Sequence, residues 1–363
     1  MRYIIVGAGA IGCSLGGQLH RGGLDTVLVA RGAQHRALRA GLRLELPGRA
    51  VELSVPVVDR PEALSLCQED ILLLAVKTQD ATAALDAWAG QPMAGGGTAA
   101  ERLPVVCAQN GVAAERMALR RFRRVYGAYL WLPASYLHPG VVEVCCGPRH
   151  GVLRIGRYPS GTDALAGRIA ADLAGCDFDG AAVSDVMRWK YGKLVSNVAN
   201  ALEALCGPIT SARSRELVRL ARAEATAVLA AAGIEHADEQ EQAAARGDRV
   251  RMLTGRGGGS TWQSLARGTG TIEVDYLNGE VVLLGRLHGV ATPVNELLQR
   301  LAEDSARAGR HPGELTADDL AARLATGLAQ PALAWARPAG LHPATASAPP
   351  GSGGWTSCPI GPC

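Results

Sequence analysis

Three lysines, Lys77, Lys190 and Lys193, are the first residues in this chain whose type suggests chemistry. They are the only lysines among 37 Lys+Arg residues, so the other 34 are arginine. Arginine stays protonated at any working pH, whereas a lysine ammonium is a compact donor whose pKa can be shifted by burial and neighbouring charges. The chain thus uses arginine in place of lysine almost everywhere. A lysine that lies in a site is therefore a candidate proton donor, whereas a lysine on the surface needs no functional explanation.

Lys193 belongs to a polar stripe on a predicted helix. Lys193, Asn197 and Asn200 follow the spacing i, i+4 and i+7, which places them on one helix face. Lys190 lies one turn earlier on nearly the same face. The flanking residues are apolar, namely Leu194, Val195, Val198, Leu202 and Leu205. Burying an ammonium and two amides without partners is costly, so we expect this stripe to line a cleft; the alternative is a solvated helix face.

A glycine motif follows the first predicted strand, Tyr3–Val6, and opens a predicted helix, Ile11–His20. In this context the pattern indicates a dinucleotide site: the first glycine permits the tight turn, the second lets the backbone approach a pyrophosphate, and the third allows close helix–strand packing. The helix N-terminus would offer its free N–H groups to the phosphates. The alternative is a purely structural turn. The candidate cofactor-binding residues are Gly7, Ala8, Gly9, Ala10, Ile11 and Gly12.

Arg31 indicates which dinucleotide the site takes. An NAD site usually carries Asp or Glu at the end of the second strand, but here Leu28-Val29-Ala30 is followed by Arg31. An arginine can hold a 2′-phosphate bidentately. We therefore expect NADP(H), with a solvated loop charge as the alternative.

Two further loops follow predicted strands, where doubly wound sheets bind their ligands. One contains Lys77, and the other contains Asn110 in an Asn-Gly pair. Lys77 is therefore expected near the cofactor. Asn110 suits the nicotinamide or its ribose, although Asn-Gly is also a common structural turn.

Ser260 follows a run of three glycines and has the character of a helix N-cap. A helix start can bind a substrate carboxylate, and a plain cap without ligand is the alternative.

Further along, Glu273 and Glu280 lie seven residues apart on one face of a predicted helix. Periodicity does not decide which of the two faces a cleft.

The order of elements predicts an α/β fold with a separate helical domain. Short apolar runs at 3–6, 26–29, 70–76, 103–107 and 125–130 alternate with helical segments, which is typical of βαβ units and a parallel sheet. Strands near 140–145 and 151–155 are expected to extend the sheet edge in antiparallel fashion. Helices are expected at 188–205, 214–232, 272–287, 293–308 and within 317–328. The predicted domains are 1–183 and 184–330, followed by a disordered tail at 331–363.

Composition excludes several classes of function. A net charge of +3 and the lack of a basic run give no reason to expect nucleic acid or an anionic membrane as partner. No apolar run approaches the ~18 residues that span a bilayer, and the N-terminus lacks the cleavage region of a signal peptide. Nine scattered cysteines fit reduced thiols in the cytoplasm. Cys358 and Cys363 lack a second Cys/His pair, so no metal is expected.

The motifs together resemble the ketopantoate reductase (2-dehydropantoate 2-reductase) family over roughly residues 1–310. The matching stretches, in order, are GAGAIG at 7–12, LVARG around Arg31, AVKTQ at 75–79, QNGV at 109–112, KLVSN at 193–197 and EVDYLNG at 273–279. The resemblance implies a Rossmann-type domain, a helical domain, and NADPH-dependent reduction of a 2-keto acid between them.

The resemblance also implies roles for individual residues. Lys193 would be the general acid, and Glu273 would contact the substrate hydroxyl or the cofactor. Lys77 and Asn110 would position the nicotinamide end. Substrate would be bound by Asn197, Asn200 and Ser260. An ammonium can protonate the alkoxide that forms when hydride reaches a keto carbon, and the lysine–asparagine spacing favours Lys193 over Lys190.

Three departures from the family pattern concern the substrate pocket. Asn200 follows Asn197 by three residues instead of four, the distance from Ser260 to Glu273 is one residue longer, and an asparagine expected near Thr210 is absent. A reductase of another ketone or imine therefore stays open beside a pantoate-forming enzyme. A non-catalytic NADP(H)-binding regulator is the alternative from a different class. A homodimer also stays open, since no motif specifies it.

Overall fold

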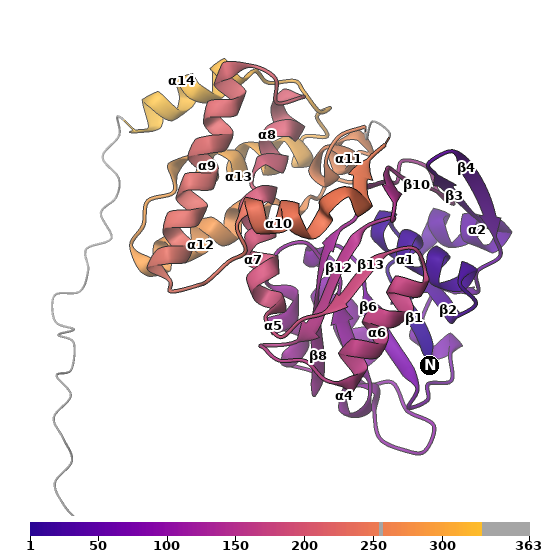
Figure 1. Cartoon of the computed structure of the whole chain (residues 1–363). Helices are drawn as coiled ribbons and strands as arrows, with labels where there is room; N and C mark the ends of the chain where they lie inside the picture. Colours follow the sequence, from indigo (N-terminus) through magenta and orange to yellow (C-terminus); the bar gives the residue numbers. More distant parts are fainter. Residues whose placement is uncertain (254–256, 329–363) are drawn as a thin grey trace, which may run out of the picture.

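The computed structural model describes residues 1–253 and 257–328, which form an α/β part followed by a helical part (Figure 1). The expected tail and its two cysteines lie outside the described residues. The predicted fold class, a doubly wound parallel sheet with a C-terminal helical region, is confirmed. No helix in the described part of the chain is long and apolar enough to cross a membrane.

The main sheet has eight strands in the order β13-β12-β8-β7-β6-β1-β2-β5. All neighbours are parallel except β12 and β8, which run antiparallel. The strands are β1 (Arg2–Val6), β2 (Asp25–Val29), β5 (Val57–Val58), β6 (Asp70–Leu74), β7 (Pro104–Cys107), β8 (Arg124–Trp131), β12 (Val152–Arg157) and β13 (Asp179–Ala182). The order reverses at β1, so the loops after β1 and β6 meet at the switch point where such sheets bind ligands.

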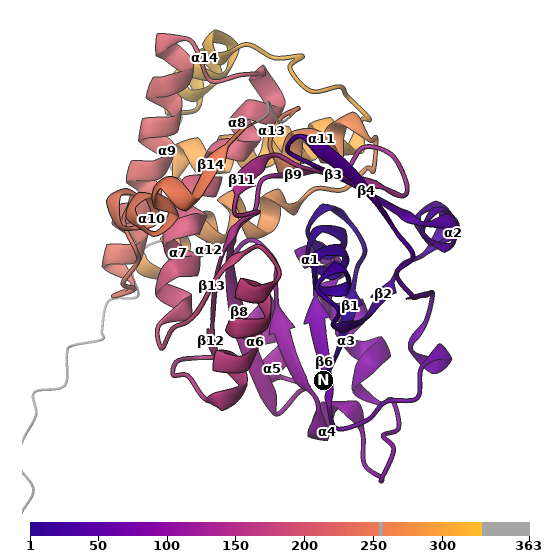
Figure 2. The same cartoon turned by 45° about the vertical axis from the view of Figure 1, so that its right-hand side comes forward.

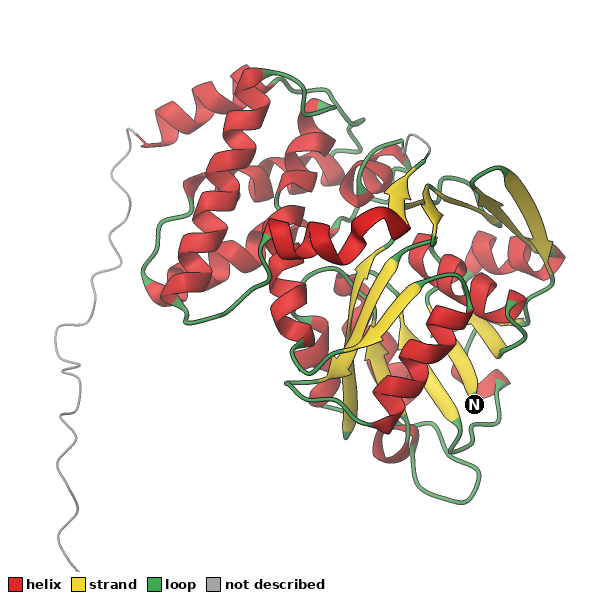
Figure 3. Cartoon of the chain, viewed as in Figure 1, coloured by secondary structure: helices red, strands yellow, loops and turns green. Residues whose placement is uncertain are grey.

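Helices cover both faces of this sheet (Figure 3). Along β1, Tyr3 and Ile5 belong to the core shared with α1 (Ala10–Arg21) and α6 (Ala164–Gly175), whereas Ile4 and Val6 belong to the core shared with α3 (Ala81–Ala89) and α5 (Ala114–Leu119). Successive strand residues point to opposite faces, so a strand buried on both faces is apolar throughout. The short helices α2 (Gly32–Ala40) and α4 (Ala99–Arg102) complete this part.

A second sheet crosses over α1, in the order β4-β3-β10-β9. Its strands are β3 (Leu42–Leu46), β4 (Arg49–Leu53), β9 (Ala134–Ser135) and β10 (Val141–Val144). The expectation that the strand near 140–145 extends the main sheet is therefore wrong, because β10 pairs with β3 and buries Val142 in the core above α1. The expectation for 151–155 is confirmed by the antiparallel strand β12.

The C-terminal part packs its helices beside the carboxyl ends of the parallel strands (Figure 2). The helices are α7 (Val186–Asn197), α8 (Ala199–Cys206), α9 (Ala212–Ala231), α10 (Glu239–Arg246), α11 (Ser260–Ala266), α12 (Asn278–His288), α13 (Pro293–Arg307) and α14 (Ala317–Leu328). The helix expected at 188–205 is two helices that meet at Val198, and the one expected at 272–287 begins with a separate 3-10 turn, η4 (Glu273–Tyr276). One short strand, β14 (Val250–Met252), pairs with β11 (Cys146–Pro148).

Candidate active site

A cavity of about 410 Å³ lies between the two parts of the chain. The loops after β1, β6 and β7 form one side, and residues of α7, α8 and α11 form the other. The structure brings most of the predicted site residues together here, namely Gly7, Gly9, Ala10, Ile11, Lys77, Asn110, Lys193, Asn197, Asn200, Ser260 and Glu273. Ala8, Gly12 and Arg31 are not among the lining residues.

The three glycines of the first loop are each explained by their surroundings. Gly7 has φ of +106°, and a Cβ there would lie 2.6 Å from the backbone nitrogen of Val76. A Cβ on Gly12 would overlap the carbonyl oxygen of Gly7. Gly9 is the opposite case, because a Cβ there would meet no atom within 4 Å. Gly9 lines the cavity, so its bare backbone leaves room for a ligand against the start of α1.

Arg31 lies directly after β2, as the sequence predicts, and its backbone caps the N-terminus of α2. The side chain is exposed and lies outside the cavity. It is close enough to Asp80, a cavity residue, for its charge to lower the pKa of that carboxyl. Burial and the charge of Glu273 raise that pKa more strongly, so the net shift of Asp80 is upward. Arg31 therefore lies at the cavity's edge rather than inside it.

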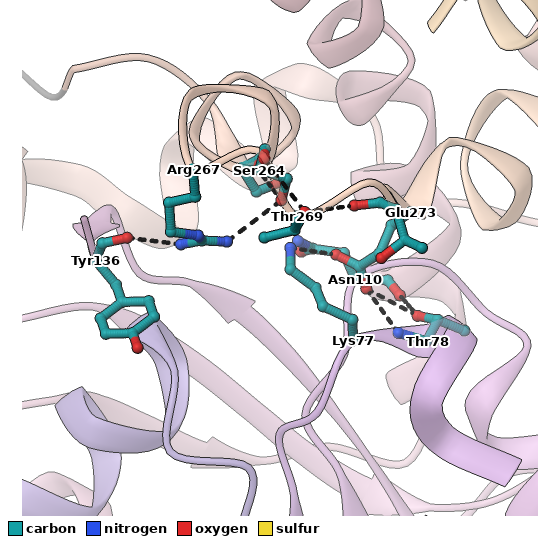
Figure 4. Close-up of polar contacts among 10 residues, drawn as sticks. Lys77, Thr78, Asn110, Tyr136, Ser264, Arg267, Thr269 and Glu273 are labelled. Carbon is teal, nitrogen blue, oxygen red and sulfur yellow. Dashed lines mark hydrogen bonds and ion pairs between the residues drawn. The ribbon is translucent and has the colours of Figure 1, made fainter. Parts of the chain in front are cut away.

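Lys77 and Glu273 form an ion pair that joins the two parts of the chain, with 2.7 Å between Nζ and Oε2 (Figure 4). The Glu273 carboxylate also accepts hydrogen bonds of 3.0 Å from the backbone N–H and the hydroxyl of Thr78. Burial alone would raise the pKa of Glu273, but the charge of Lys77 and these hydrogen bonds outweigh burial and lower it. Glu273 thus reaches the cavity as a carboxylate. Glu280, the other candidate, does not line the cavity.

Lys193 lies on α7, with its side chain in the cavity. Its Nζ donates a hydrogen bond to the carbonyl oxygen of Leu130 and lies 5.9 Å from the centre of the Tyr129 ring. Both contacts come from β8 and hold the ammonium at the wall of the cavity.

Asn197 and Asn200 both line the cavity, although they belong to different helices. α7 ends at Asn197 and α8 starts at Ala199, so the three-residue spacing does not remove Asn200 from the wall. The side-chain nitrogen of Asn197 is buried, and no group in the described part of the chain forms a hydrogen bond with it. Such a donor is costly unless a ligand pairs with it.

Ser260 also lines the cavity, but the expectation that it caps α11 is wrong. The N-cap is Gly259, and Ser260 is the first residue of the helix. The backbone N–H of Gly259 donates to the carboxylate of Glu203 over 2.9 Å. A side chain from α8 therefore binds the N-cap residue, and no side-chain cap hydrogen bond is formed within the described residues at this end of the helix.

Lys190 does not line the cavity. It is buried, and its Nζ pairs with the carboxylate of Glu115 on α5 and donates to the carbonyl oxygen of Gln109 over 3.1 Å. The structure therefore places Lys190 at the junction between the two parts of the chain and not in the cavity.

Sequence reasoning missed several lining residues, including Trp131, Tyr136, Gln263 and Arg267. Gln263 and Arg267 follow Ser260 by three and seven residues, a helix-face spacing that could have identified them. Gln263 accepts from the Tyr136 backbone N–H over 3.2 Å and donates to the Ala134 carbonyl over 3.2 Å. These bonds connect α11 to β9 and to the residue that follows it, a contact that no local pattern predicts.

Comparison with known proteins identifies the class of this fold and site. Residues 3–160 match the family model described as "Ketopantoate reductase PanE/ApbA", and residues 185–305 match the model of its C-terminal domain. The chain belongs to the ketopantoate reductase family.

Relatives and solved structures align with most of this chain. A 2-dehydropantoate 2-reductase from Archaeoglobus fulgidus is 31% identical over 314 residues, covering 83% of this chain and 96% of the relative. A ketopantoate reductase structure from Ralstonia eutropha has a TM-score of 0.70 and 28% identity, covering 86% of this chain and 100% of the other. D-mandelate dehydrogenase with NADH and anilino(oxo)acetate has a TM-score of 0.73 at 22% identity, covering 85% and 99%, which shows the shared fold.

Proposed function

We propose that this protein reduces a 2-keto acid to a 2-hydroxy acid with NADPH, and that 2-dehydropantoate is the first substrate to test. One observation carries the proposal: the glycine loop and the Lys193 ammonium line the same cavity of about 410 Å³. A nicotinamide cofactor bound there would supply the hydride. The open space at Gly9 fits a pyrophosphate, whereas a Cβ at that position would project into the cavity.

Lys193 is the proposed general acid. When hydride reaches the keto carbon, the carbonyl oxygen becomes an alkoxide, and an ammonium within hydrogen-bond reach protonates it as it forms. The ammonium donates to the Leu130 carbonyl at the wall of the cavity, where it would also donate to the carbonyl oxygen of a bound keto acid. A neutral backbone carbonyl is a weaker acceptor than a developing alkoxide, so the hydrogen bond to Leu130 does not prevent Lys193 from donating to the substrate.

Lys77, Asn110 and Glu273 are proposed to position the nicotinamide end and the substrate hydroxyl. The Lys77–Glu273 pair fixes both side chains between the two parts of the chain. Thr78 adds rigidity, since its hydroxyl lies within hydrogen-bond distance of both Glu273 and the Asn110 carbonyl. The two loops that follow β6 and β7 are thereby linked to η4.

Arg31 is proposed to select the phosphorylated cofactor. It is exposed at the end of β2 and no acidic residue occupies that strand end. A 2′-phosphate would accept charge-assisted hydrogen bonds from its guanidinium.

Asn197, Asn200 and Ser260 are proposed to bind the substrate. The unpartnered side-chain nitrogen of Asn197 supports this role, because a substrate oxygen would satisfy it. All three residues lie on the helical side of the cavity, opposite the glycine loop.

The domain division at residue 183, between the end of β13 and the start of α7, is part of the same proposal.

Oxidation of NADPH, followed by its absorbance with a panel of 2-keto acids that includes 2-dehydropantoate, tests the function. We expect NADPH to be oxidised with at least one of these acids, and we expect pantoate as the product from 2-dehydropantoate. Tight NADPH binding without oxidation by any acid would overturn the reductase and favour a cofactor-binding regulator. Activity with ketones or imines alone would favour the alternative substrate class.

We also propose a cytoplasmic location and keep the homodimer as a prediction. The seven cysteines in the described part of the chain are all free thiols, which suits a reducing compartment. Leu283 and Leu287 are exposed one turn apart on α12 and would suit a partner surface. Light scattering on the purified protein measures the oligomeric state directly, and a monomer mass would contradict the dimer.

A further inference from the structure

Arg267 is a cation in the cavity whose contacts are all uncharged. It follows the last residue of α11 and is half-buried. Its guanidinium donates to the Tyr136 carbonyl over 2.6 Å and to the Ser264 hydroxyl over 3.4 Å, and lies 5.1 Å from the centre of the Tyr136 ring. Within residues 1–253 and 257–328 it forms no ion pair. The two carboxylates that line the cavity, Asp80 and Glu273, are grouped with Lys77 instead.

Arg267 and the glycine loop line the same cavity, and a chain of contacts connects them. The Tyr136 hydroxyl donates to the side-chain oxygen of Gln34 over 3.1 Å, and the Gln34 amide donates to the Ala8 carbonyl over 2.8 Å. Arg267, Tyr136, Gln34 and the loop are therefore consecutive neighbours. Figure 4 shows Arg267 and Tyr136 on one side of the view and Lys77, Asn110 and Glu273 on the other.

The half-buried guanidinium of Arg267 has no counter-ion among the described residues, which is an unfavourable arrangement for a cation. Burial lowers the pKa of Arg267, but an arginine remains charged at working pH. The charge has lost part of its hydration, and its neutral partners compensate only incompletely. The N-terminus of α1, which lines the same cavity, adds a positive dipole end, and its first turn has no acidic residue. An anionic ligand at this end of the cavity would relieve both.

We propose that Arg267 binds an anionic group of a ligand in the cavity, and that it does so from the helical side, across from the glycine loop. The proposal rests on the proposed function, since that function supplies the anions. Two groups share the required chemistry: a phosphate of the dinucleotide's pyrophosphate, and a second carboxylate of a substrate larger than a simple keto acid. The neighbourhood of Tyr136, Gln34 and Ala8 favours the pyrophosphate.

The test compares Arg267→Met with Arg300→Met, a matched change at an exposed arginine of α13 that does not line the cavity. The dissociation constant of NADPH is measured by fluorescence titration without substrate. If the pyrophosphate is the partner, Arg267→Met weakens NADPH by about 10- to 100-fold, as expected for charged hydrogen bonds, and Arg300→Met leaves it unchanged. Arg267→Lys, which keeps the charge but not the planar fork, recovers part of the loss.

A second arm identifies a substrate carboxylate. The selectivity of kcat/KM for 2-oxoglutarate over pyruvate is measured for the same proteins. If the second carboxylate is the partner, Arg267→Met lowers this selectivity by about tenfold or more while NADPH affinity stays the same. Unchanged NADPH affinity together with unchanged selectivity would overturn the proposal.

The melting temperature of the ligand-free proteins separates binding from a structural role. If Arg267 serves to bind a ligand, the ligand-free Arg267→Met protein should melt at the same temperature as Arg300→Met or at a higher one. A lower value combined with unaltered NADPH affinity would make Arg267 merely structural and contradict the proposal. A wild-type protein that binds no NADPH and reduces no keto acid would instead overturn the proposed function itself, so the two failures are distinguishable.

Discussion

Lys190 on α7 and Glu115 on α5 form an ion pair whose side chains are 2% and 0% exposed. The same ammonium donates to the carbonyl oxygen of Gln109, the residue before Asn110. One buried cation therefore connects the first helix of the C-terminal part, the α/β part and the loop that carries a proposed cofactor contact. Its environment is closed, in contrast to that of Lys193 three residues later.

Lys190→Met leaves the Glu115 carboxylate buried without its counter-charge. Removing one partner of a buried ion pair costs about 3–5 kcal/mol, so we expect the free energy of unfolding, measured in urea, to fall by about that amount. The turnover of the protein that remains folded should fall far less than in Lys193→Met. The double variant Lys190→Met/Glu115→Leu should recover most of the stability, and a double variant as unstable as the single one would contradict the ion-pair explanation.

Lys193→Met removes the proposed proton donor. We expect kcat to fall about 10²–10⁴-fold, the usual contribution of general acid catalysis, with NADPH affinity little changed. Lys193→Arg is the informative companion, because it keeps the charge while arginine is a poor proton donor. Steady-state kinetics and fluorescence titration measure both quantities. A Lys193→Arg variant with wild-type turnover would show that the charge alone matters.

Gly9→Ala and Gly12→Ala should separate ligand space from packing. Gly9 has no atom within 4 Å of a built Cβ, so its alanine variant should fold with a stability within about 0.5 kcal/mol of wild type. The methyl group projects into the cavity and should weaken NADPH. Gly12→Ala brings a methyl group onto the Gly7 carbonyl and should destabilise the fold itself. Melting curves and NADPH titrations distinguish the two, and equal loss of stability would contradict the assignment of Gly9 to ligand space.

Arg31→Ala should raise KM for NADPH by about tenfold, since charged hydrogen bonds to the 2′-phosphate are lost from a solvent-exposed side chain. KM for NADH should change little. Arg39→Ala, at an exposed arginine in the last turn of α2, serves as the control. Equal changes for NADPH and NADH in Arg31→Ala would count against a 2′-phosphate contact.

Glu273 gives the protein a defined acid sensitivity. Its pKa in the folded protein is lowered from the ordinary 4.5, so its contribution to stability is present above that pH and is lost as pH falls through the lowered value. Melting temperatures of wild type and Glu273→Gln should therefore differ at pH 7 and converge as pH drops below 4.5. A difference that grows on acidification would mean that the folded-state pKa is raised instead.

Local patterns were sufficient for the central strands of the main sheet, the glycine loop and nearly half of the cavity-lining residues. The strands around Ile4, Leu72 and Val105 are apolar because both of their faces are buried, and this pattern is visible in the sequence. Gly7, Gly9 and Gly12 could be assigned because each role depends on backbone within a few residues.

Interactions between distant segments could not be predicted. The pairing of β10 with β3 joins strands about 100 residues apart, and apolar alternation does not identify the partner. Arg267 and Tyr136 are 131 residues apart, and their contact depends on how α11 sits on the segment after β9. The role of Lys190 likewise depended on Glu115, 75 residues earlier.

The scarcity of lysine has a practical consequence for following this protein in solution. Every side-chain amine in the chain lies in the cavity or at the junction beside it, with Lys77 partly exposed and Lys190 almost fully buried. Reductive methylation with ¹³C-formaldehyde would therefore place NMR labels on these lysines and the N-terminal amine alone. The Lys77 and Lys193 signals would report on the two sides of the cavity, and the rate at which buried Lys190 reacts would measure how often the junction opens.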